Sequence, residues 1–185
     1  MPNTFFSIKI NAELPINKLE KGLFVFMYRA TRIPPHLGII FNGKRYDITL
    51  QEPNLGVDAS EFSTSIIKKF TKTIFFEIHQ PKESEEENLV LSLKNAIKQF
   101  QKISETTSCI SPLKLFFNEA YQLNTSQVNF IFDLIPLLIE NQLIINTYHL
   151  NLERNINQNE FLLKTYTKED ILNCLEALNR KEVTC

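Results

Sequence analysis

A predicted β-hairpin near residue 40 is the feature that most constrains how this chain folds. Residues 35–49 read Pro-His-Leu-Gly-Ile-Ile-Phe-Asn-Gly-Lys-Arg-Tyr-Asp-Ile-Thr, with one strand-like run before Asn42-Gly43 and a second after it. Asn-Gly favours the two-residue turns whose twist matches paired strands, because both residues tolerate positive φ. The hairpin therefore predicts that His36 and Asp47 lie on adjacent antiparallel strands, where their side chains can meet.

The order of the other predicted elements indicates the fold class. Strands are predicted at 4–10, 22–29 and 73–78, with a polar turn region at 51–59 and a short helix at 60–70. Later segments predict helices at 86–104 and 113–123, a helix after Thr125 that contains Pro136, a final strand pair at 143–148 and 161–166, and a last helix capped by Thr167. Strands followed by helices predict an α+β fold, a small antiparallel sheet from the N-terminal half packed against helices.

Length and charge restrict the classes of protein to consider. At 185 residues the chain is most simply one domain, 1–185, large enough to bury a core. Its 20 Lys and Arg balance 21 Asp and Glu, so the whole chain has no general attraction to nucleic acid or an anionic membrane. We expect no membrane span, because no apolar run approaches about 20 residues. The lack of a basic and apolar leader predicts a cytoplasmic protein.

Of the three cysteines, Cys109 is the candidate for chemistry. An odd number without local spacing predicts neither a disulfide framework nor a zinc site. Cys109 follows a polar loop, where an apolar helix begins, and the N–H groups at a helix start favour a thiolate and can bind an oxyanion. Pro112 leaves a second interpretation open, in which the helix begins there with Ser111 as its N-cap and Cys109 precedes it. Cys174 is predicted to be a core residue of the last helix, and Cys185 a loose terminus.

Together these segments resemble the circularly permuted papain-like hydrolases, which include NlpC-type peptidases, YiiX-type proteins and relatives of lecithin–retinol acyltransferase. The similarity lies in an apolar strand at 22–28, the motif His36-Leu37-Gly38-Ile39, the polar Asp47 on the second strand, and Cys109 at a helix start followed by Asn-Glu-Ala-Tyr at 118–121. It covers a catalytic core over residues 20–125 and leaves 126–185 as a C-terminal extension or cap. Ile110 and Pro112 depart from the family pattern.

The resemblance implies a thiol-dependent peptidase, amidase or acyltransferase. Cys109 would be the nucleophile, His36 the general base, and Asp47 the group that orients the imidazole. Such chemistry needs no metal or organic cofactor. The implied substrate is a peptide, an isopeptide or a lipid acyl group.

Other interpretations of the same residues remain open. Taken singly, His36 fits a half-exposed strand residue, Asp47 a surface carboxylate and Cys109 a small buried hydrophobe. A non-catalytic binding or regulatory protein with the same fold is the main alternative, and a helical interaction module over 86–145 is a third. The sequence does not determine the oligomeric state.

Overall fold

Two β-sheets and five α-helices make up the part of the chain that the structure describes. The computed structural model describes residues 4–15, 17–81 and 85–183; Cys185 lies outside these ranges. In spatial order the main sheet contains β2 (Ala12–Glu13), β8 (Ile144–Leu150), β7 (Thr73–Ile78), β3 (Leu23–Tyr28), β4 (His36–Phe41), β5 (Lys44–Ile48) and β6 (Pro53–Asp58). Its neighbouring strands are antiparallel except for the pair β2 and β8.

The smaller sheet and the helices complete the fold. The smaller sheet contains β1 (Phe5–Lys9), β10 (Glu160–Lys164) and β9 (Ile156–Asn157). The helices are α1 (Ala59–Lys68), α2 (Glu86–Phe100), α3 (Ile110–Tyr121), α4 (Ile131–Glu140) and α5 (Lys168–Val183), with short 3-10 turns at Lys18–Glu20 and Glu153–Asn155. The α+β fold class predicted from the sequence is confirmed.

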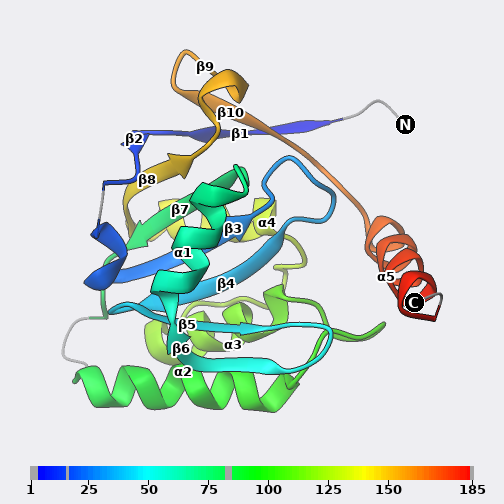
Figure 1. The fold of residues 1–185 in the computed structure, drawn as a ribbon. Coiled ribbons are helices and arrows are strands. Elements are labelled where there is room, and N and C mark those ends of the chain that lie inside the picture. The colour runs from blue at the N-terminus through cyan, green and yellow to red at the C-terminus, as the bar shows by residue number, and fades with distance from the viewer. Residues whose placement is uncertain (1–3, 16, 82–84, 184–185) are drawn as a thin grey trace.

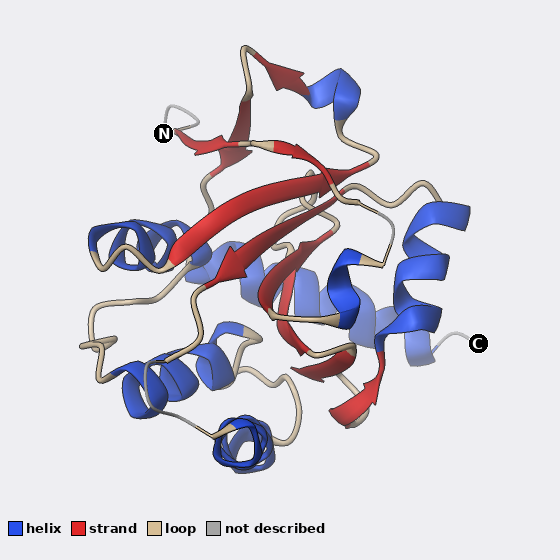
Figure 2. Ribbon diagram, turned by 90° about the vertical axis from the view of Figure 1, so that its left-hand side faces the viewer, coloured by secondary structure: helices blue, strands red, loops and turns tan. Residues whose placement is uncertain are grey.

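Helices cover both faces of the main sheet. Figure 1 shows α1 on one face, and α2, α3 and α4 on the other; the second view supports this arrangement (Figure 2). The central strand β3 sends Phe24 and Phe26 toward α1, and Val25 and Met27 toward the other helices. Because both faces of this strand are buried, its sequence is a continuous apolar run and not an alternating one.

The structure confirms the hairpin. Strands β4 and β5 pair antiparallel around Asn42 and Gly43, whose φ angles are 45° and 73°. The Asn42 side chain also accepts a hydrogen bond from the Gly22 backbone N–H at 2.9 Å, which attaches the turn to the start of β3. Turn chemistry and a cross-strand contact therefore both fix the register of the hairpin.

Three sequence-based expectations about the sheets are wrong. Residues 51–59 do not form a polar turn region, because 53–58 are the edge strand β6, paired with β5. The main sheet is also not drawn only from the N-terminal half. The segments at 143–148 and 161–166 do not pair with each other: β8 adds to β7 in the main sheet, whereas β10 pairs with β1. Partners so far apart in sequence leave no local signal.

Helix boundaries differ from prediction at two places. Helix α3 begins at Ile110, so Pro112 is its third residue, within the first turn, where its missing N–H breaks no helical hydrogen bond. Thr125 caps no helix; it is buried and donates a hydrogen bond to the Lys114 carbonyl at 3.1 Å. The cap at Thr167 is confirmed, because its hydroxyl accepts from the Asp170 N–H at 3.3 Å.

Gly38 is predicted to be essential for packing on the α1 face. A Cβ at this position would lie 2.6 Å from Cβ of Asp47 and would also overlap the Phe26 ring. We therefore expect Gly38→Ala to lower the free energy of unfolding by about 1–3 kcal/mol, measured by urea denaturation. Gln99→Ala, at an exposed position of α2, should change it by less than about 0.5 kcal/mol. Equal stabilities of the two variants would contradict this account of Gly38.

Candidate active site

The carboxylate of Asp47 is the centre of the candidate site. Its side chain is fully buried and accepts hydrogen bonds from three other residues. His36 Nε2 lies 2.6 Å from Oδ2, Arg45 donates from Nη2 to Oδ2 at 2.7 Å and from Nε to Oδ1 at 2.8 Å, and Asn54 Nδ2 donates to Oδ1 at 2.8 Å. Both oxygens are thus satisfied, as a buried carboxylate requires.

Strand register explains why these side chains converge. Asp47 and Arg45 are two residues apart on β5, so they point to the same face of the sheet. Asn54 is directly opposite Asp47 on β6. Continuing the β4–β5 pairing places Asp47 opposite Gly38, two residues from His36 on the same face. Because Gly38 has no side chain, the space between His36 and Asp47 stays open and the two can bond diagonally.

Arg45 is held in place by aromatic packing as well as by Asp47. Its guanidinium lies 4.3 Å from the Phe62 ring centroid of α1 and 5.7 Å from that of Phe26. Cation–π contacts of this kind and the bidentate carboxylate bond fix the orientation of the guanidinium. Helix α1 therefore supports the site, although it contributes no hydrogen bond to Asp47.

The charges of His36 and Asp47 stabilise each other. Burial lowers the pKa of His36, but hydrogen bonds with Asp47 and Cys109 outweigh burial and raise it from 6.5 to about 9. Burial likewise raises the pKa of Asp47, yet hydrogen bonds from His36 and Arg45 reverse this and hold it below the ordinary value. At neutral pH the site therefore contains an imidazolium, a guanidinium and one carboxylate. Their net charge of +1 favours a nearby anion.

Cys109 is at the start of α3, next to His36. It occupies the N-cap position of that helix, and its thiol points toward the Pro35 carbonyl, with Sγ 3.9 Å from that oxygen. The thiol is close enough to His36 for a hydrogen bond to contribute to the pKa of the imidazole. Since Asp47 engages Nε2, the ring nitrogen left for the thiol is Nδ1. The structure thus brings together all three residues that the sequence predicted as a site.

The position of Cys109 answers the question raised by Pro112. The helix starts at Ile110, not at Pro112, so the thiol is within the first turn of the helix N-terminus. There the backbone N–H groups lack carbonyl partners within the helix, and their partial positive charge favours an anion. Ser111 N–H bonds the Ser108 carbonyl at 3.0 Å, which fixes the chain around Cys109.

A cavity of about 610 Å³ opens beside His36 and Cys109. The C-terminal helix α5 forms one wall of this cavity with apolar side chains and with Cys174. The prediction that Cys174 is a core residue is wrong, because it is half-buried and borders the same cavity as Cys109. Among the described residues, no Asp or Glu lines the cavity, whereas three arginines do: Arg29, Arg32 and Arg45.

Tyr166 is a further polar group near the thiol. Its ring lines the cavity, and its pKa is raised by burial and by the charge of Cys109. The ring packs edge-on against Phe130 at 5.3 Å and Phe132 at 5.3 Å. Tyr166 is 57 residues after Cys109 in the sequence, so no local pattern indicated that it belongs to the site.

Sequence reasoning missed Arg45, Asn54 and Tyr166. Arg45 had an available signal, since residues i and i+2 of a strand share a face and Arg45 precedes Asp47 by two. Asn54 had none, because the segment that contains it was not recognised as a strand. The site therefore depends on β6, a strand that the sequence did not reveal.

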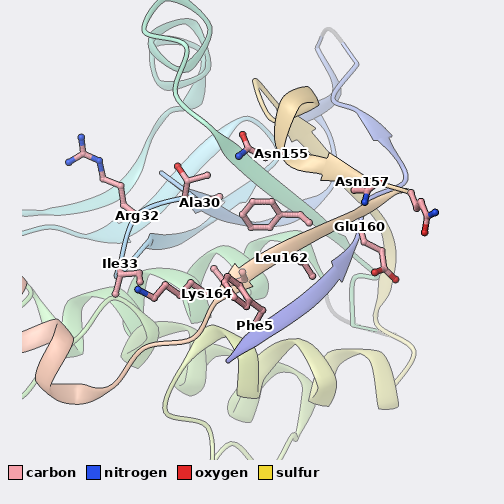
Figure 3. Close-up of a pocket in the computed structure, with 13 residues that line it drawn as sticks. Phe5, Ala30, Arg32, Ile33, Asn155, Asn157, Glu160, Leu162 and Lys164 are labelled. Atoms are coloured by element: carbon pink, nitrogen blue, oxygen red, sulfur yellow. The ribbon is translucent and has the colours of Figure 1, made fainter. Parts of the chain in front are cut away.

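A second cavity of about 330 Å³ lies between the loop after β3 and the smaller sheet (Figure 3). Its lining combines polar and apolar side chains, among them Phe5, Glu160 and Lys164 from β1 and β10. The part of the lining that the structure describes contains no cysteine or histidine. Among the described residues, no group of three or more His, Cys, Asp or Glu is arranged to hold a metal ion. Within the same residues no helix is long and apolar enough to cross a membrane.

Comparison with known proteins adds no relative. No protein-family model, no curated protein and no solved structure matches this chain.

The raised pKa of His36 predicts a specific pH dependence of stability. Because His36 titrates near 6.5 when unfolded and about 9 when folded, its charge stabilises the fold fully below pH 6.5. That contribution, on the order of 3 kcal/mol, should be lost as pH rises through about 9. The difference in free energy of unfolding between wild type and His36→Gln, measured in urea, should narrow over this interval. Gln99→Ala, at an exposed position of α2, replaces no ionisable group and should show no such narrowing.

Proposed function

We propose that this protein is a thiol-dependent hydrolase or acyltransferase that acts through Cys109, His36 and Asp47. One observation carries the proposal: Cys109 occupies the N-cap position of helix α3, next to an imidazole that is hydrogen-bonded to a buried carboxylate. Covalent acyl chemistry generally uses a nucleophile that contacts a base, and a third group that contacts and orients the base. The similarity of the His36 and Cys109 segments to permuted papain-like hydrolases is consistent with it.

The proposed reaction has two stages. In the first, the Cys109 thiolate attacks a carbonyl carbon, a C–S bond forms, and the Ile110 N–H at the start of α3 stabilises the oxyanion, because Ser111 N–H is bonded to Ser108 and Pro112 has no N–H. The intermediate collapses, His36 gives its proton to the leaving amine or alcohol, and a thioester remains on Cys109. In the second, water or an acceptor alcohol or amine gives its proton to His36 and attacks the thioester. The acyl product leaves, and the thiolate and imidazolium are restored.

The residues that line the cavity indicate which chemical properties a substrate needs. Ile171, Leu175 and Leu178 of α5 give one wall apolar character, and Arg29 and Arg32 add positive charge elsewhere in the lining. A substrate with an apolar portion and an anionic group would match both. Peptides, isopeptides and acyl lipids can all have these properties, so we retain the three classes.

Thiol alkylation tests the proposal directly. Cys109 and Cys174 are both half-buried and border one cavity, so Cys174 is a matched control thiol. The rates are compared in two single-cysteine variants, one that keeps only Cys109 and one that keeps only Cys174, with the remaining cysteines replaced by serine. At pH 6 Cys109 should react with iodoacetamide at least about tenfold faster than Cys174, because the imidazolium of His36 persists to pH about 9. His36→Gln should remove most of this advantage. Equal rates for Cys109 and Cys174 would refute the catalytic proposal.

Asp47→Asn tests the orienting role. The neutral amide leaves the imidazole without its charged partner, so we expect turnover of a model thioester or ester to fall by about 10²–10⁴-fold. Because Asp47 also neutralises Arg45, urea denaturation must first establish that the variant is folded under assay conditions. Asn54→Ala removes a hydrogen bond to the same carboxylate but leaves its charge, and should cost less turnover. An unchanged rate in Asp47→Asn would exclude Asp47 as the orienting residue.

A non-catalytic binding protein is the alternative, and one observation favours it. Helix α5 of the chain itself forms a wall of the cavity that contains Cys109, which leaves less room for a large substrate. In that case Cys109 would pack against Pro35 and His36, and the apolar cavity would hold a ligand without reaction. Reactivity of Cys109 no greater than that of Cys174 is the result that supports this alternative.

A further inference from the structure

Two linked turns at one end of the main sheet form a basic surface with an exposed aromatic residue. We call this surface, made of 28–32 and 67–72, the basic tip. The Ala30 N–H donates to the Lys72 carbonyl at 2.9 Å, and the end of α1 lies beside the loop after β3 in Figure 1. The Asn151 side chain holds the second turn by donating to the carbonyls of Ile66 and Thr71 at 3.2 Å and 3.1 Å. The tip is therefore a fixed part of the fold.

Phe70 occupies a position that is unfavourable for a phenylalanine. Helix α1 ends in a Schellman motif, in which Thr71 N–H bonds the Ile66 carbonyl at 2.9 Å and Phe70 N–H bonds that of Ile67 at 3.2 Å. The motif puts Phe70 at φ 50°, where glycine is usual, and its side chain is 78% exposed. The neighbouring Ile67 is 57% exposed. Neither side chain contributes to the core, so core packing does not explain why these two positions hold large apolar residues.

The charge of the tip has a single sign. Arg29, Arg32, Lys68, Lys69 and Lys72 lie in these two segments, which contain no Asp or Glu. None of the five forms an ion pair with another described residue. The nearest carboxylate along α1 is Glu61, two turns earlier. Figure 3 shows the Arg32 guanidinium directed away from the other labelled residues. The chain has a net charge of -1, so this concentration of cations is local.

Tyr28, at the base of the tip, experiences this positive charge. Burial raises the pKa of Tyr28, but a hydrogen bond with Thr71 and the cations Arg29 and Lys69 outweigh burial and lower it. The Arg29 guanidinium also lies 5.3 Å from the Tyr28 ring centroid. The electrostatics thus agree with the distribution of the side chains.

We propose that the basic tip docks the protein on the surface of an anionic lipid bilayer. Lysines near a membrane surface are attracted to acidic headgroups, and aromatic side chains partition into the interfacial region. A protruding Phe70 surrounded by cations fits such a planar, charged and partly apolar partner. A nucleic acid would instead be bound along a groove with several stacking side chains, and the tip presents one exposed ring.

Docking in this way would bring the candidate active site near the lipid. Arg29 and Arg32 belong both to the tip and to the lining of the cavity beside Cys109. The proposal does not depend on catalysis by Cys109, because it rests only on exposure and charge at the tip.

Vesicle co-sedimentation of the full chain tests the proposal. We expect binding to vesicles of phosphatidylcholine and phosphatidylserine, no binding to phosphatidylcholine alone, and loss of binding in high salt. Phe70→Gly should weaken binding at least about tenfold while leaving the urea midpoint unchanged or higher, because glycine suits the left-handed position. Leu91→Ala, which removes a side chain 57% exposed on α2, is the apolar control and should bind as wild type.

Charge reversal provides the second arm. The double variant Lys68→Glu with Lys69→Glu should abolish binding, whereas Lys98→Glu with Lys102→Glu, at exposed positions in and just after α2, should have a small effect. Equal losses in the two double variants would mean that overall charge, not the tip, drives association. Wild-type binding by Phe70→Gly, or tighter binding to an RNA duplex than to anionic vesicles, would overturn the proposal.

Discussion

The buried carboxylate of Asp47 is the group on which the site depends. An ion removed from water is tolerated only if its lone pairs and charge are compensated, and here Arg45, His36 and Asn54 do this together. These three residues come from three neighbouring strands. The hydrogen bonds of Asp47 therefore join β4, β5 and β6 at the end of the sheet where α3 begins.

The same arrangement determines the electrostatics around Cys109. Two cationic groups share one carboxylate, so the site retains positive charge until His36 loses its proton at about pH 9. The N-terminus of α3 adds its partial positive charge at the thiol. An anion on sulfur or on a carbonyl oxygen would be stabilised by both effects, which is the physical basis for the acyl chemistry that we propose for this cavity.

Local patterns predicted much of the fold. The Asn42-Gly43 turn predicted the hairpin, and thereby the proximity of His36 and Asp47, because turn type fixes strand register. The long amphipathic and apolar segments gave α1, α2, β3 and β7 at nearly the observed places. Strand β6 was missed because its side chains are only half-buried at an edge and do not alternate. The start of α3 was misplaced because proline is accepted anywhere in a first helical turn.

By itself, then, the sequence determined the fold class and the hairpin through short-range physics, and it singled out His36, Asp47 and Cys109 as candidates through their order along the chain. Tertiary structure decided which strands pair, β8 with β7 and β10 with β1. These partners are far apart in the sequence, and the cost of closing a long loop varies too little with its length to select one partner over another. It also decided that Arg45 and Asn54 donate hydrogen bonds to Asp47, that Tyr166 and Cys174 border the cavity, and that Lys72 lies against Ala30 at the basic tip. Such contacts arise only when separate segments pack, because no property of either segment alone specifies its partner.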